Sequence, residues 1–569
     1  MSKKILVVGG GGREHAIIKA LKKSPDCGEV WCAPGNGGIG YDAHCVNIKA
    51  TDVETMVGFA ETEKFDYVVV AQDDPLALGM VDALAAVGIP AFGPDKAAAR
   101  IEASKVFSKD LMKKYGIPTA KYETFDDPAK VMEYIKAEGK YPVVIKADGL
   151  ALGKGVLICE NEEQAAEGVK EIMLDKKFGA SGNHVVVEEF LTGPEVSVLS
   201  FTDGKVVKPM VSSMDHKRAN DHDTGLNTGG MGTVAPNPYY TPAIAAECME
   251  KIFLPTIKAM NAEGCPFKGC LYFGLMLTPD GPKVIEYNCR FGDPETQVVL
   301  PLLEGDLLHI MQACTNGTLE NEEVKFSDGA AACVILASGG YPVAYEKGKP
   351  ITGLVDGQLP DEENVTVYHS GTAITEDGTL VTAGGRVLGV TATGDTLPQA
   401  IANAYAAAKL AGLDADDQSI YYTPLFTYAA NPDAEKTISF ANYLAALYQE
   451  IAENDRDHWP EGWTGSEFTA LAGNVGEPEY GDISRGTLLD LLPKAARVQL
   501  VSVSADTART LTGLDGVSRT YQESLSEYEP AGDTVLIVTD TQTLTAIGTE
   551  NYTVLRDYGD AYWDVRMNI

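Results

Sequence analysis

The chain has 569 residues, of which 46 are Lys or Arg and 81 are Asp or Glu, so its formal net charge is −35. This length exceeds one ordinary core and predicts about three to five domains, since single domains usually hold about 100 to 200 residues. So acidic a surface disfavours nucleic acid and anionic membranes as partners, because binding to phosphate-rich surfaces depends on Lys and Arg.

The composition is typical of a globular protein, with 45% hydrophobic and 22% charged residues. No apolar run approaches the roughly 18 residues that span a bilayer. The short apolar run at residues 5–8 ends at Gly9, which is too early for a signal peptide, and we expect a cytoplasmic protein. Ten cysteines occur singly, without a CxxC pair, which predicts reduced thiols rather than a zinc site or a disulfide framework.

The first hundred residues alternate short apolar runs with helical patterns. Strands are predicted at residues 5–8, 30–33 and 67–71, and helices at residues 15–22 and 76–87. This alternation predicts a parallel sheet with helices on both faces.

From residue 142 onward the strands become denser. They are predicted at residues 142–146, 184–190, 196–202, 269–278 and 283–288. We expect an α+β region dominated by antiparallel pairs. Further on, strands at 331–337, 365–369 and 387–391 precede a helix at 397–410.

The composition changes after residue 424. Residues 431–569 contain no cysteine, three of the four tryptophans, and 23 acidic against 9 basic side chains, a balance of −14. We expect a linker at 429–434 and then a small α/β domain. Its predicted elements are a helix at 439–452 and strands at 498–503, 534–539 and 552–555.

Residues 9–15 read GGGGREH and follow the first predicted strand. Glycines let the backbone approach a ligand closely, and the N-terminus of the next helix offers free amides to an anion, so the loop is suited to phosphate. A dinucleotide fingerprint fits badly, because Glu14 takes the place of the third glycine. The alternative is a tight turn without a ligand.

Residues 144–155 place Lys146 and Lys154 around a glycine-bearing turn between two predicted strands. The segment lacks the ending of a Walker loop, yet a lysine at a strand end can hold phosphate and a hairpin can close over a nucleotide. The predicted strand at 184–190 contains Glu188 and Glu189 near its end, and such an acid can accept hydrogen bonds from adenine or ribose. The alternative for each acid is a solvated turn.

Glu286 and Asn288 lie on one face of a predicted strand, with about 7 Å between them, because side chains alternate along strands. Two such oxygen ligands suit Mg²⁺, which completes its octahedron with water and substrate phosphates. Arg290 follows on the same side and can grip a carboxylate or a phosphate. The alternative is an exposed polar strand edge.

Residues 214–232 place Asp215 and Lys217 beside the glycine-rich loop NTGGMG at 227–232, and we expect a loop that contacts a ligand.

Together these motifs resemble glycinamide ribonucleotide synthetase (phosphoribosylamine-glycine ligase). The similarity covers residues 1 to about 420 and rests on GGGGREH, APGN at 33–36, the 146–155 segment, EEFLTGPE, DHKR, NTGGMG and VIEYNCRFGDPETQ, in this order. It implies an α/β and α+β multidomain fold. The implied parts are a Rossmann-like N-terminal domain at 1–104, an ATP-grasp core at 105–326 with a lid at about 120–190, a small C-terminal synthetase domain at 327–428, and an extra acidic α/β tail domain at 429–569.

The resemblance also implies the activity and its residues. ATP-dependent ligation would join glycine to 5-phosphoribosylamine through glycyl phosphate, the second step of de novo purine biosynthesis. The implied ATP-binding residues are Lys105, Lys146, Lys154, Glu188, Leu191 and Glu195. Mg²⁺ or Mn²⁺ would bind Glu286 and Asn288, and Arg290, Asp293 and Lys146 would be catalytic. The substrates would meet Gly11, Gly12, Arg13, Glu14, His15, Asn36, Asp215, Lys217, Arg290 and Asp293.

Three features depart from the family pattern. Gln72-Asp73-Asp74 stands where the family has Gly-Pro-Glu, and Gly225-Leu226 where it has Gly-Pro. The arginine-bearing segment that closes the family's C-terminal domain is missing near residues 421–424. These changes bear on substrate affinity rather than on the type of reaction. Residues 271–276 also offer no carboxylate for a second metal ion.

Two other functions remain open. One is an ATP-grasp ligase for a different carboxylate, for example one that uses bicarbonate with an aminoimidazole ribotide. The other is a nucleotide-binding regulatory protein without turnover, against which the presence of Lys146, Glu286 and Arg290 argues. For the tail we expect oligomer contact, partner docking or a passive fusion.

Overall fold

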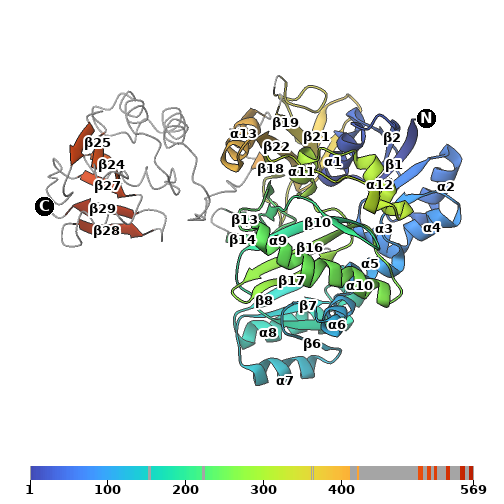
Figure 1. Ribbon diagram of the computed structural model, residues 1–569, viewed down its shortest axis with the longest axis horizontal. Coiled ribbons are helices and arrows are strands. Elements are labelled where there is room, and N and C mark those ends of the chain that lie inside the picture. The colour runs from blue at the N-terminus through green and yellow to red at the C-terminus, as the bar shows by residue number, and fades with distance from the viewer. Residues whose placement is uncertain are drawn as a thin grey trace. The chain divides into compact units, whose positions relative to one another are not determined.

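The computed structural model describes residues 2–150, 155–220, 224–360, 362, 364–410 and 420–421, together with the backbone of six strands between residues 497 and 567 (Figure 1). The chain divides into two compact units, Met1–Leu425 and Phe426–Ile569, which are described separately.

The first unit begins with a five-stranded parallel sheet in the order β3-β2-β1-β4-β5. Alternate residues of β1 enter different cores: Leu6 lies in one core with residues of α2, and Ile5 lies in the other with residues of α1. The predicted parallel sheet with helices on both faces is therefore confirmed. The bounds are β1 (Lys3–Gly9), α1 (Gly12–Leu21), β2 (Cys27–Pro34), β3 (His44–Cys45), α2 (Val53–Glu63), β4 (Tyr67–Val70) and β5 (Ala91–Phe92).

The single helix predicted at 76–87 is wrong. Two helices, α3 (Asp73–Leu78) and α4 (Met80–Ala86), meet at Gly79. Its φ of 92° lies in the left-handed region, which glycine enters without steric penalty and which ends a right-handed helix. Two further helices, α5 (Lys96–Ala103) and α6 (Lys105–Tyr115), lead into the next part of the chain.

A four-stranded antiparallel sheet forms the centre of this unit, in the order β11-β10-β16-β17. Leu271 and Phe273 of β16 share a core with residues of α9 and α10, whereas Cys270 and Tyr272 on the other face share a core with α12. The predicted antiparallel region is confirmed. The bounds are β10 (Glu195–Asp203), β11 (Val207–Pro209), α9 (Pro242–Cys248), α10 (Leu254–Ala262), β16 (Lys268–Thr278), β17 (Gly281–Asn288), α11 (Thr296–Val299) and α12 (Leu307–Asn316).

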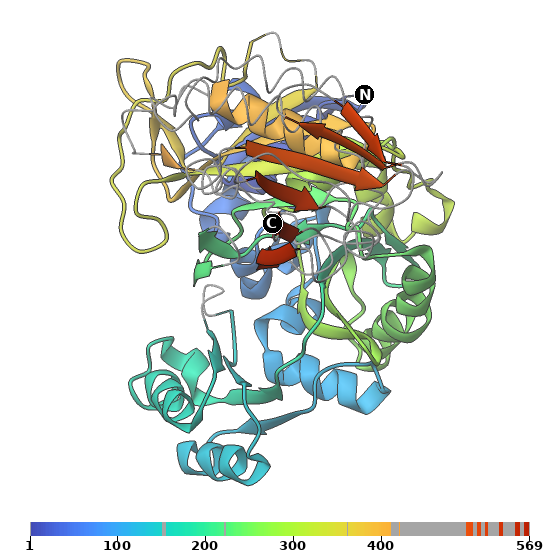
Figure 2. The same cartoon turned by 90° about the vertical axis from the view of Figure 1, so that its left-hand side faces the viewer.

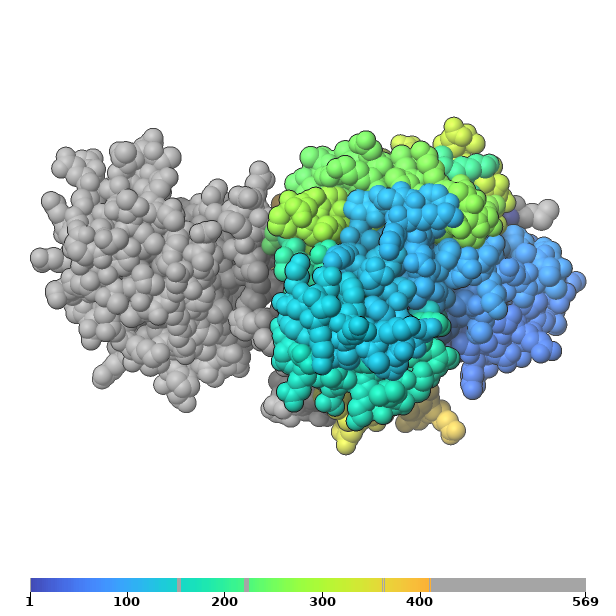
Figure 3. Space-filling view, turned by 90° about the horizontal axis from the view of Figure 1, so that it is seen from below, coloured from blue at the N-terminus to red at the C-terminus, as the bar shows by residue number. Residues whose placement is uncertain are grey.

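A second antiparallel sheet, in the order β6-β9-β7-β8, forms the lower lobe in Figure 2 together with α7 and α8. We call this lobe the lid. Its small core includes Val131, Ile145, Val169 and Val187, and in Figure 3 the lid, coloured cyan, occupies the centre of the face seen from below. The bounds are β6 (Tyr122–Phe125), α7 (Pro128–Glu138), β7 (Val143–Ala147), β8 (Val156–Cys159), α8 (Glu162–Val169) and β9 (Val185–Glu189).

The last part of the first unit is an antiparallel sheet in the order β12-β15-β18-β22-β19, packed against α13. Strands β12 and β15 come from the loop region at 214–235, so the predicted ligand loop is attached to the C-terminal sheet. The elements predicted between 331 and 410 are confirmed. The bounds are β12 (Met214–Asp215), β13 (Arg218–Asn220), β14 (Thr224–Asn227), β15 (Gly232–Ala235), β18 (Ala330–Ser338), β19 (Val365–His369), β20 (Thr372–Ile374), β21 (Leu380–Thr382), β22 (Arg386–Gly394), α13 (Leu397–Leu410) and β23 (Ile420–Tyr421).

The second unit contains a six-stranded sheet in the order β26-β25-β24-β27-β29-β28. Strands β24 and β27 are parallel, and the other pairs are antiparallel. The three predicted strands are confirmed, whereas the predicted linker at 429–434 and helix at 439–452 lie outside the described residues. The bounds are β24 (Arg497–Val503), β25 (Arg509–Gly513), β26 (Ser518–Tyr521), β27 (Thr534–Val538), β28 (Tyr552–Asp557) and β29 (Trp563–Met567).

The ten cysteines are all free thiols, and all but Cys27 and Cys45 are buried. Among the helices that the structure describes, none combines the length and the apolar character needed to cross a membrane.

Candidate active site

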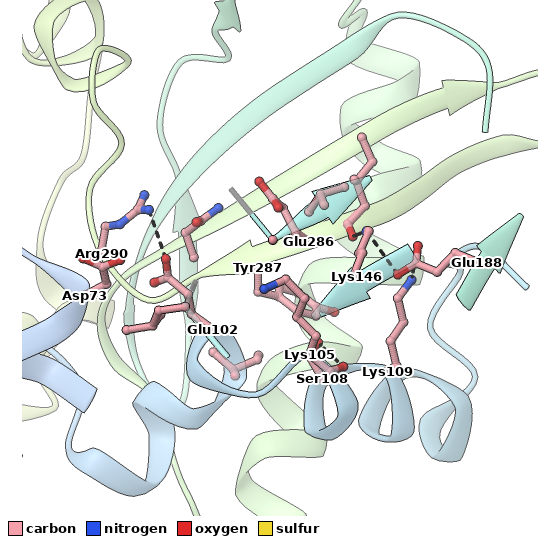
Figure 4. A pocket seen from close by; sticks show the side chains of 16 residues that line it. Asp73, Glu102, Lys105, Ser108, Lys109, Lys146, Glu188, Glu286, Tyr287 and Arg290 are labelled. Carbon is pink, nitrogen blue, oxygen red and sulfur yellow. Dashed lines mark hydrogen bonds and ion pairs between the residues drawn. The ribbon is translucent and has the colours of Figure 1, made fainter. Parts of the chain in front are cut away.

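A cavity of about 180 Å³ lies between the lid, helices α5 and α6, and strand β17 (Figure 4). Six of the residues predicted from the sequence line it: Lys105, Lys146, Glu188, Glu286, Asn288 and Arg290. They come from three parts of the fold, and the structure brings them together around one space.

Glu286 and Asn288 follow one another on the same face of β17, as the two-residue alternation predicts. Opposite Glu286 on β16 stands Gly274, where a Cβ would lie 3.1 Å from Glu286 Cγ, so the glycine makes room for the carboxylate. Burial alone would raise the pKa of Glu286. The charges of nearby cations outweigh burial and lower this pKa, so the carboxylate stays ionised; the cations are Lys217, Lys146, Lys105 and Arg290.

Glu188 on β9 is held between two lysines. Lys109 Nζ lies 3.0 Å from one carboxylate oxygen and Lys146 Nζ lies 3.1 Å from the other. All three side chains are at most 6% exposed. Burial lowers the pKa of Lys109 to about 8, with Glu188 opposing the shift. The three groups form a compact charged cluster at the edge of the cavity, which we call the lysine–glutamate cluster.

Lys109 was not predicted as a site residue. It lies one helical turn after Lys105 on α6, and residues four apart share a helix face, so this spacing could have suggested it. Ser104 caps the helix, since its hydroxyl accepts from the Phe107 amide at 3.1 Å.

Lys105 joins the start of α6 to the lid, because its ammonium group donates to the Gly149 carbonyl at 2.5 Å. Burial lowers the pKa of Lys105. Of the other predicted ATP-binding residues, Leu191 follows β9, and Glu195 begins β10 with Lys217 Nζ 2.5 Å from its carboxylate. Lys154 lies outside the described residues.

Arg290 leaves the end of β17 and pairs with Glu102 at 3.0 Å. The other Glu102 oxygen accepts from the Cys289 amide at 2.7 Å. Arg290 Nε is buried without a hydrogen-bond partner among the described residues, so this side chain retains an unused donor. Glu102 was not predicted, and nothing in the local pattern of α5 marks it.

Asp293 lies in the turn after Arg290. Its carboxylate accepts from Gln297 Nε2 at 2.8 Å and lies 3.4 Å from a guanidinium nitrogen of Arg386. Burial would raise the pKa of Asp293, but the neighbouring arginines, Arg386 first, lower it below its ordinary value. Arg386 comes from β22 and was not predicted.

The glycine-rich loop packs against a second loop and against the turn that follows β17. A Cβ at Gly10 would lie 2.5 Å from the Gly35 carbonyl oxygen. The Gly11 amide donates to Glu14 at 2.5 Å, and Arg13 donates both to Glu14 at 2.7 Å and to the Phe291 carbonyl at 3.1 Å. Two predicted substrate residues, Arg13 and Glu14, therefore lie beside the turn that carries Arg290 and Asp293. At Gly12 a Cβ would lie 2.6 Å from Gln297 Nε2, so a side chain there would displace that amide group.

His15 and Asn36 contact the C-terminal sheet instead of the cavity. His15 is fully buried; its Nε2 lies 3.0 Å from an Asp42 oxygen, and its Nδ1 accepts from the His369 amide at 2.9 Å. The Asn36 amide donates to the carbonyls of Gly10 and His369. Burial lowers the pKa of His15. In this conformation both ring nitrogens of His15 already have protein partners.

Asp215 on β12 lies beside Glu295, whose carboxylate accepts from the Tyr272 hydroxyl at 2.8 Å. One oxygen of Asp215 is shielded from solvent without a hydrogen bond among the described residues. Burial, followed by the charge of Glu295, raises the pKa of Asp215 well above its ordinary value.

In the part of the chain that the structure describes, no three His, Cys, Asp or Glu side chains gather into a closed metal site. Glu286 and Asn288 instead offer an ionised carboxylate and an amide oxygen. This pair fits an ion that takes few protein ligands and shares its shell with phosphates, as Mg²⁺ does.

Three family models match consecutive parts of the chain. The N domain of phosphoribosylglycinamide synthetase matches residues 3–102, its ATP-grasp (A) domain residues 103–296, and its C domain residues 331–420.

Individual relatives and solved structures are similar to this chain over the same region. A phosphoribosylamine-glycine ligase of Caldanaerobacter subterraneus is 48% identical over 402 residues, which cover 71% of this chain and 95% of the relative. The solved phosphoribosylamine-glycine ligase of Thermotoga maritima is 35% identical with a TM-score of 0.62, covering 74% of this chain and 97% of that one. The biotin carboxylase domain of Hydrogenobacter thermophilus 2-oxoglutarate carboxylase, solved with MgADP, shares the fold at 16% identity and a TM-score of 0.57, covering 74% and 91%.

Proposed function

Because this chain belongs to the phosphoribosylglycinamide synthetase family, we propose that it joins glycine to 5-phosphoribosylamine with cleavage of ATP, giving glycinamide ribonucleotide, ADP and phosphate in de novo purine biosynthesis. One observation supports this proposal beyond family membership: Lys105, Lys146 and Glu286 line the same cavity. A cytoplasmic location, and small molecules rather than nucleic acid or membrane as binding partners, belong to the same proposal.

The reaction proceeds in two transfers. A carboxylate oxygen of glycine attacks the γ-phosphorus of ATP, the bond to ADP breaks, and glycyl phosphate forms. The amine of phosphoribosylamine then attacks the glycyl carbonyl, loses a proton, and phosphate leaves. Such steps need positioning and charge neutralisation more than covalent help from the protein.

Cations of the cavity supply that neutralisation. Lys105 and Lys146 hold the ATP phosphates, and Lys154 joins them by its place in the family motif. Lys146 is buried and Lys105 is half-buried, and there an attraction between charges is screened less than in water.

Glu188 accepts from the adenine amino group, with Leu191 beside the ring and Glu195 at the ribose. The pairing of Glu188 with Lys109 and Lys146 is compatible with this role, because a carboxylate offers about four lone-pair sites and two lysines use only part of them.

Glu286 and Asn288 hold Mg²⁺ or Mn²⁺. When bound, the metal neutralises phosphate charge and fixes the phosphate oxygens for transfer. The lowered pKa of Glu286 supports the assignment, since a ligand carboxylate must be ionised at neutral pH.

Arg290 grips the glycine carboxylate and then the acyl phosphate, with Asp293 beside it and Lys146 close to the transferred group. The sugar phosphate lies at Gly11 and Gly12, at the N-terminus of α1. Because the Gly11 amide already donates to Glu14, the phosphate takes the Gly12 amide. Arg13 and Glu14 border this loop, and His15 and Asn36 support it from the side of the C-terminal sheet. Asp215 on β12 and Lys217, which follows that strand, close over the sugar phosphate.

The substrate test uses the full chain. ADP formation should require both glycine and phosphoribosylamine. ADP formation with bicarbonate and an aminoimidazole ribotide instead would assign another ATP-grasp ligation, and ATP binding without ADP release under any of these conditions would indicate a regulatory protein.

We propose the domain boundaries 1–104, 105–326, 327–428 and 429–569, and a contact role for the last domain. Relatives lend support, since 71% of this chain already covers 95% of one relative. A chain shortened after residue 428 should keep turnover and lose oligomer or partner contacts, which mass measurement in solution can follow. Loss of turnover with an unchanged oligomeric state and unchanged partner contacts would contradict a contact role.

A further inference from the structure

Arg386 begins strand β22 of the C-terminal sheet, yet its guanidinium group reaches two segments of the candidate site. One nitrogen donates to the Gly229 carbonyl at 2.6 Å and to the Asp293 carbonyl at 2.8 Å, with the Gly230 carbonyl at 3.4 Å. A second nitrogen lies 3.4 Å from the Asp293 carboxylate. The side chain is 18% exposed.

From this geometry we propose that Arg386 is a positioning residue for the ligation reaction: it fixes the 227–232 loop and the Asp293 turn in one arrangement, so that the C-terminal domain completes the glycine site. The proposal rests on the proposed function, because it assigns the loop and Asp293 to substrate.

The two segments are packed too closely to adjust independently. At Gly230, whose φ of 108° favours glycine, a Cβ would lie 2.5 Å from Pro294 Cδ and 2.6 Å from an Asp215 oxygen. At Gly229 a Cβ would lie 3.1 Å from Arg386 Cζ. The loop backbone therefore fits between Arg386 and the turn, and removal of the guanidinium group leaves its carbonyls without that donor.

A planar guanidinium group suits this task because it presents several donors in fixed directions. Three backbone carbonyls and one carboxylate converge on it from two segments of the chain. An ammonium group in its place would keep the charge but could not span the same acceptors in the same geometry. Lysine at this position should therefore restore only part of the function.

The kinetic test compares Arg386→Gln, Arg386→Lys and the full-length wild type. We expect Arg386→Gln to lower kcat/KM for glycine by about 10- to 100-fold, since misplacement of a reacting group by about 1 Å has effects of this size. The KM for ATP should stay within about twofold, because Arg386 does not line the nucleotide cavity. Arg386→Lys should recover part of the loss. Lys347→Gln, which removes an exposed cation of the same domain, should match the wild type.

Wild-type kinetics of Arg386→Gln would overturn the proposal. So would an equal loss for ATP and glycine that follows a fall in Tm, which would mean that Arg386 only fastens the C-terminal domain. If the wild type forms no ADP with glycine and phosphoribosylamine, the proposed function fails instead. Hydrogen exchange over residues 227–232 then still tests whether Arg386 fixes this loop: faster exchange in Arg386→Gln supports that role, and unchanged exchange contradicts it.

Discussion

Glu102 holds Arg290 from the side of the cavity formed by helix α5. One carboxylate oxygen lies 3.0 Å from a guanidinium nitrogen, and the other accepts from the Cys289 amide at 2.7 Å. The two side chains are 9% and 17% exposed. Burial raises the pKa of Glu102, and the charge of Arg290 opposes this shift. Removal of either side chain would therefore leave the other as an uncompensated buried charge. The arginine proposed to grip glycine is thus fixed before any substrate binds.

Glu102→Gln should therefore weaken the hold on Arg290 without leaving a cavity beside it, because glutamine is nearly the same size as glutamate. We expect kcat/KM for glycine to fall about 10- to 100-fold, because the orientation of a carboxylate grip is lost. Steady-state kinetics measure the effect. Glu263→Gln is a matched control, since Glu263 pairs with the exposed Lys114 and neither residue lines the cavity. Unchanged kinetics for glycine would mean that Glu102 does not position Arg290.

Glu286→Gln should leave folding largely intact and abolish detectable turnover. The change removes the one ionised oxygen ligand proposed for the metal, and loss of such an electrostatic contribution lowers kcat by about 10²- to 10³-fold or more. Titration of Mn²⁺ in the presence of ADP should show weaker metal binding by the variant. Near-normal turnover, or unchanged Mn²⁺ affinity, would remove Glu286 from the metal role.

Lys109→Met should disturb the lysine–glutamate cluster. Glu188 would then pair with Lys146 alone. This pairing would hold Lys146 away from the ATP phosphates, so we expect the KM for ATP to rise about tenfold. The KM for glycine should change little. Lys113→Met, on an exposed part of the same helix, is the control. Equal rises in both KM values would contradict a nucleotide-specific role.

The same cluster predicts a pH dependence of stability. The pKa of Lys109 is about 8 in the folded protein, below its ordinary value of 10.5. The unfolded chain therefore binds more protons between these two values, and the free energy of unfolding from this group rises as the pH increases from 8 to 10.5. Lys109→Met should abolish that rise. Chemical denaturation of both proteins at pH 7.5 and 10 checks the sign.

Asp215→Asn should stabilise the protein at neutral pH. The raised pKa of Asp215 means that burial, and after it the charge of Glu295, disfavours the ionised carboxylate in the folded state. Stability from this group is thus greatest at low pH and falls as the pH rises from the ordinary range of aspartate through the folded value. The gain in Tm from asparagine should shrink as the pH approaches 4. A Tm of Asp215→Asn below that of the wild type at pH 7 would contradict this account.

His309 should stabilise the folded protein at low pH. Its Nε2 lies 2.8 Å from an Asp26 oxygen, and this hydrogen bond raises the pKa of the imidazole. The stabilisation is complete below the ordinary pKa of 6.5 and is lost as the pH rises through the folded value. His309→Gln should lower Tm more at pH 5.5 than at pH 8.5. Asp26→Asn should remove the same difference.

Sequence patterns predicted what local periodicity controls. The alternation along β17 placed Glu286 and Asn288 on one face, and the strand before GGGGREH was found within two residues of its ends. The pattern could not show Gly79 dividing one expected helix into two, because its left-handed conformation depends on how α3 and α4 pack.

The contacts that hold the site residues could not be predicted from the sequence. Glu102 contacts the Cys289 amide 187 positions away, and Arg386 contacts Asp293 across 93 positions. Such pairs arise when separate layers of the fold meet, and no spacing rule reports them. For the same reason His15 could be placed next to a phosphate loop by sequence, whereas its partners on β19 and at Asp42 emerge only from the packing of two sheets.

One peptide carbonyl connects the two substrate regions. The oxygen of Phe291 accepts from Arg13, next to the loop proposed for the sugar phosphate, and Phe291 directly follows Arg290. A ligand that draws Arg13 toward its phosphate therefore moves the backbone that orients Arg290. We expect the affinities for glycine and phosphoribosylamine to be linked, and linkage is reciprocal: each substrate must change the binding of the other by the same factor.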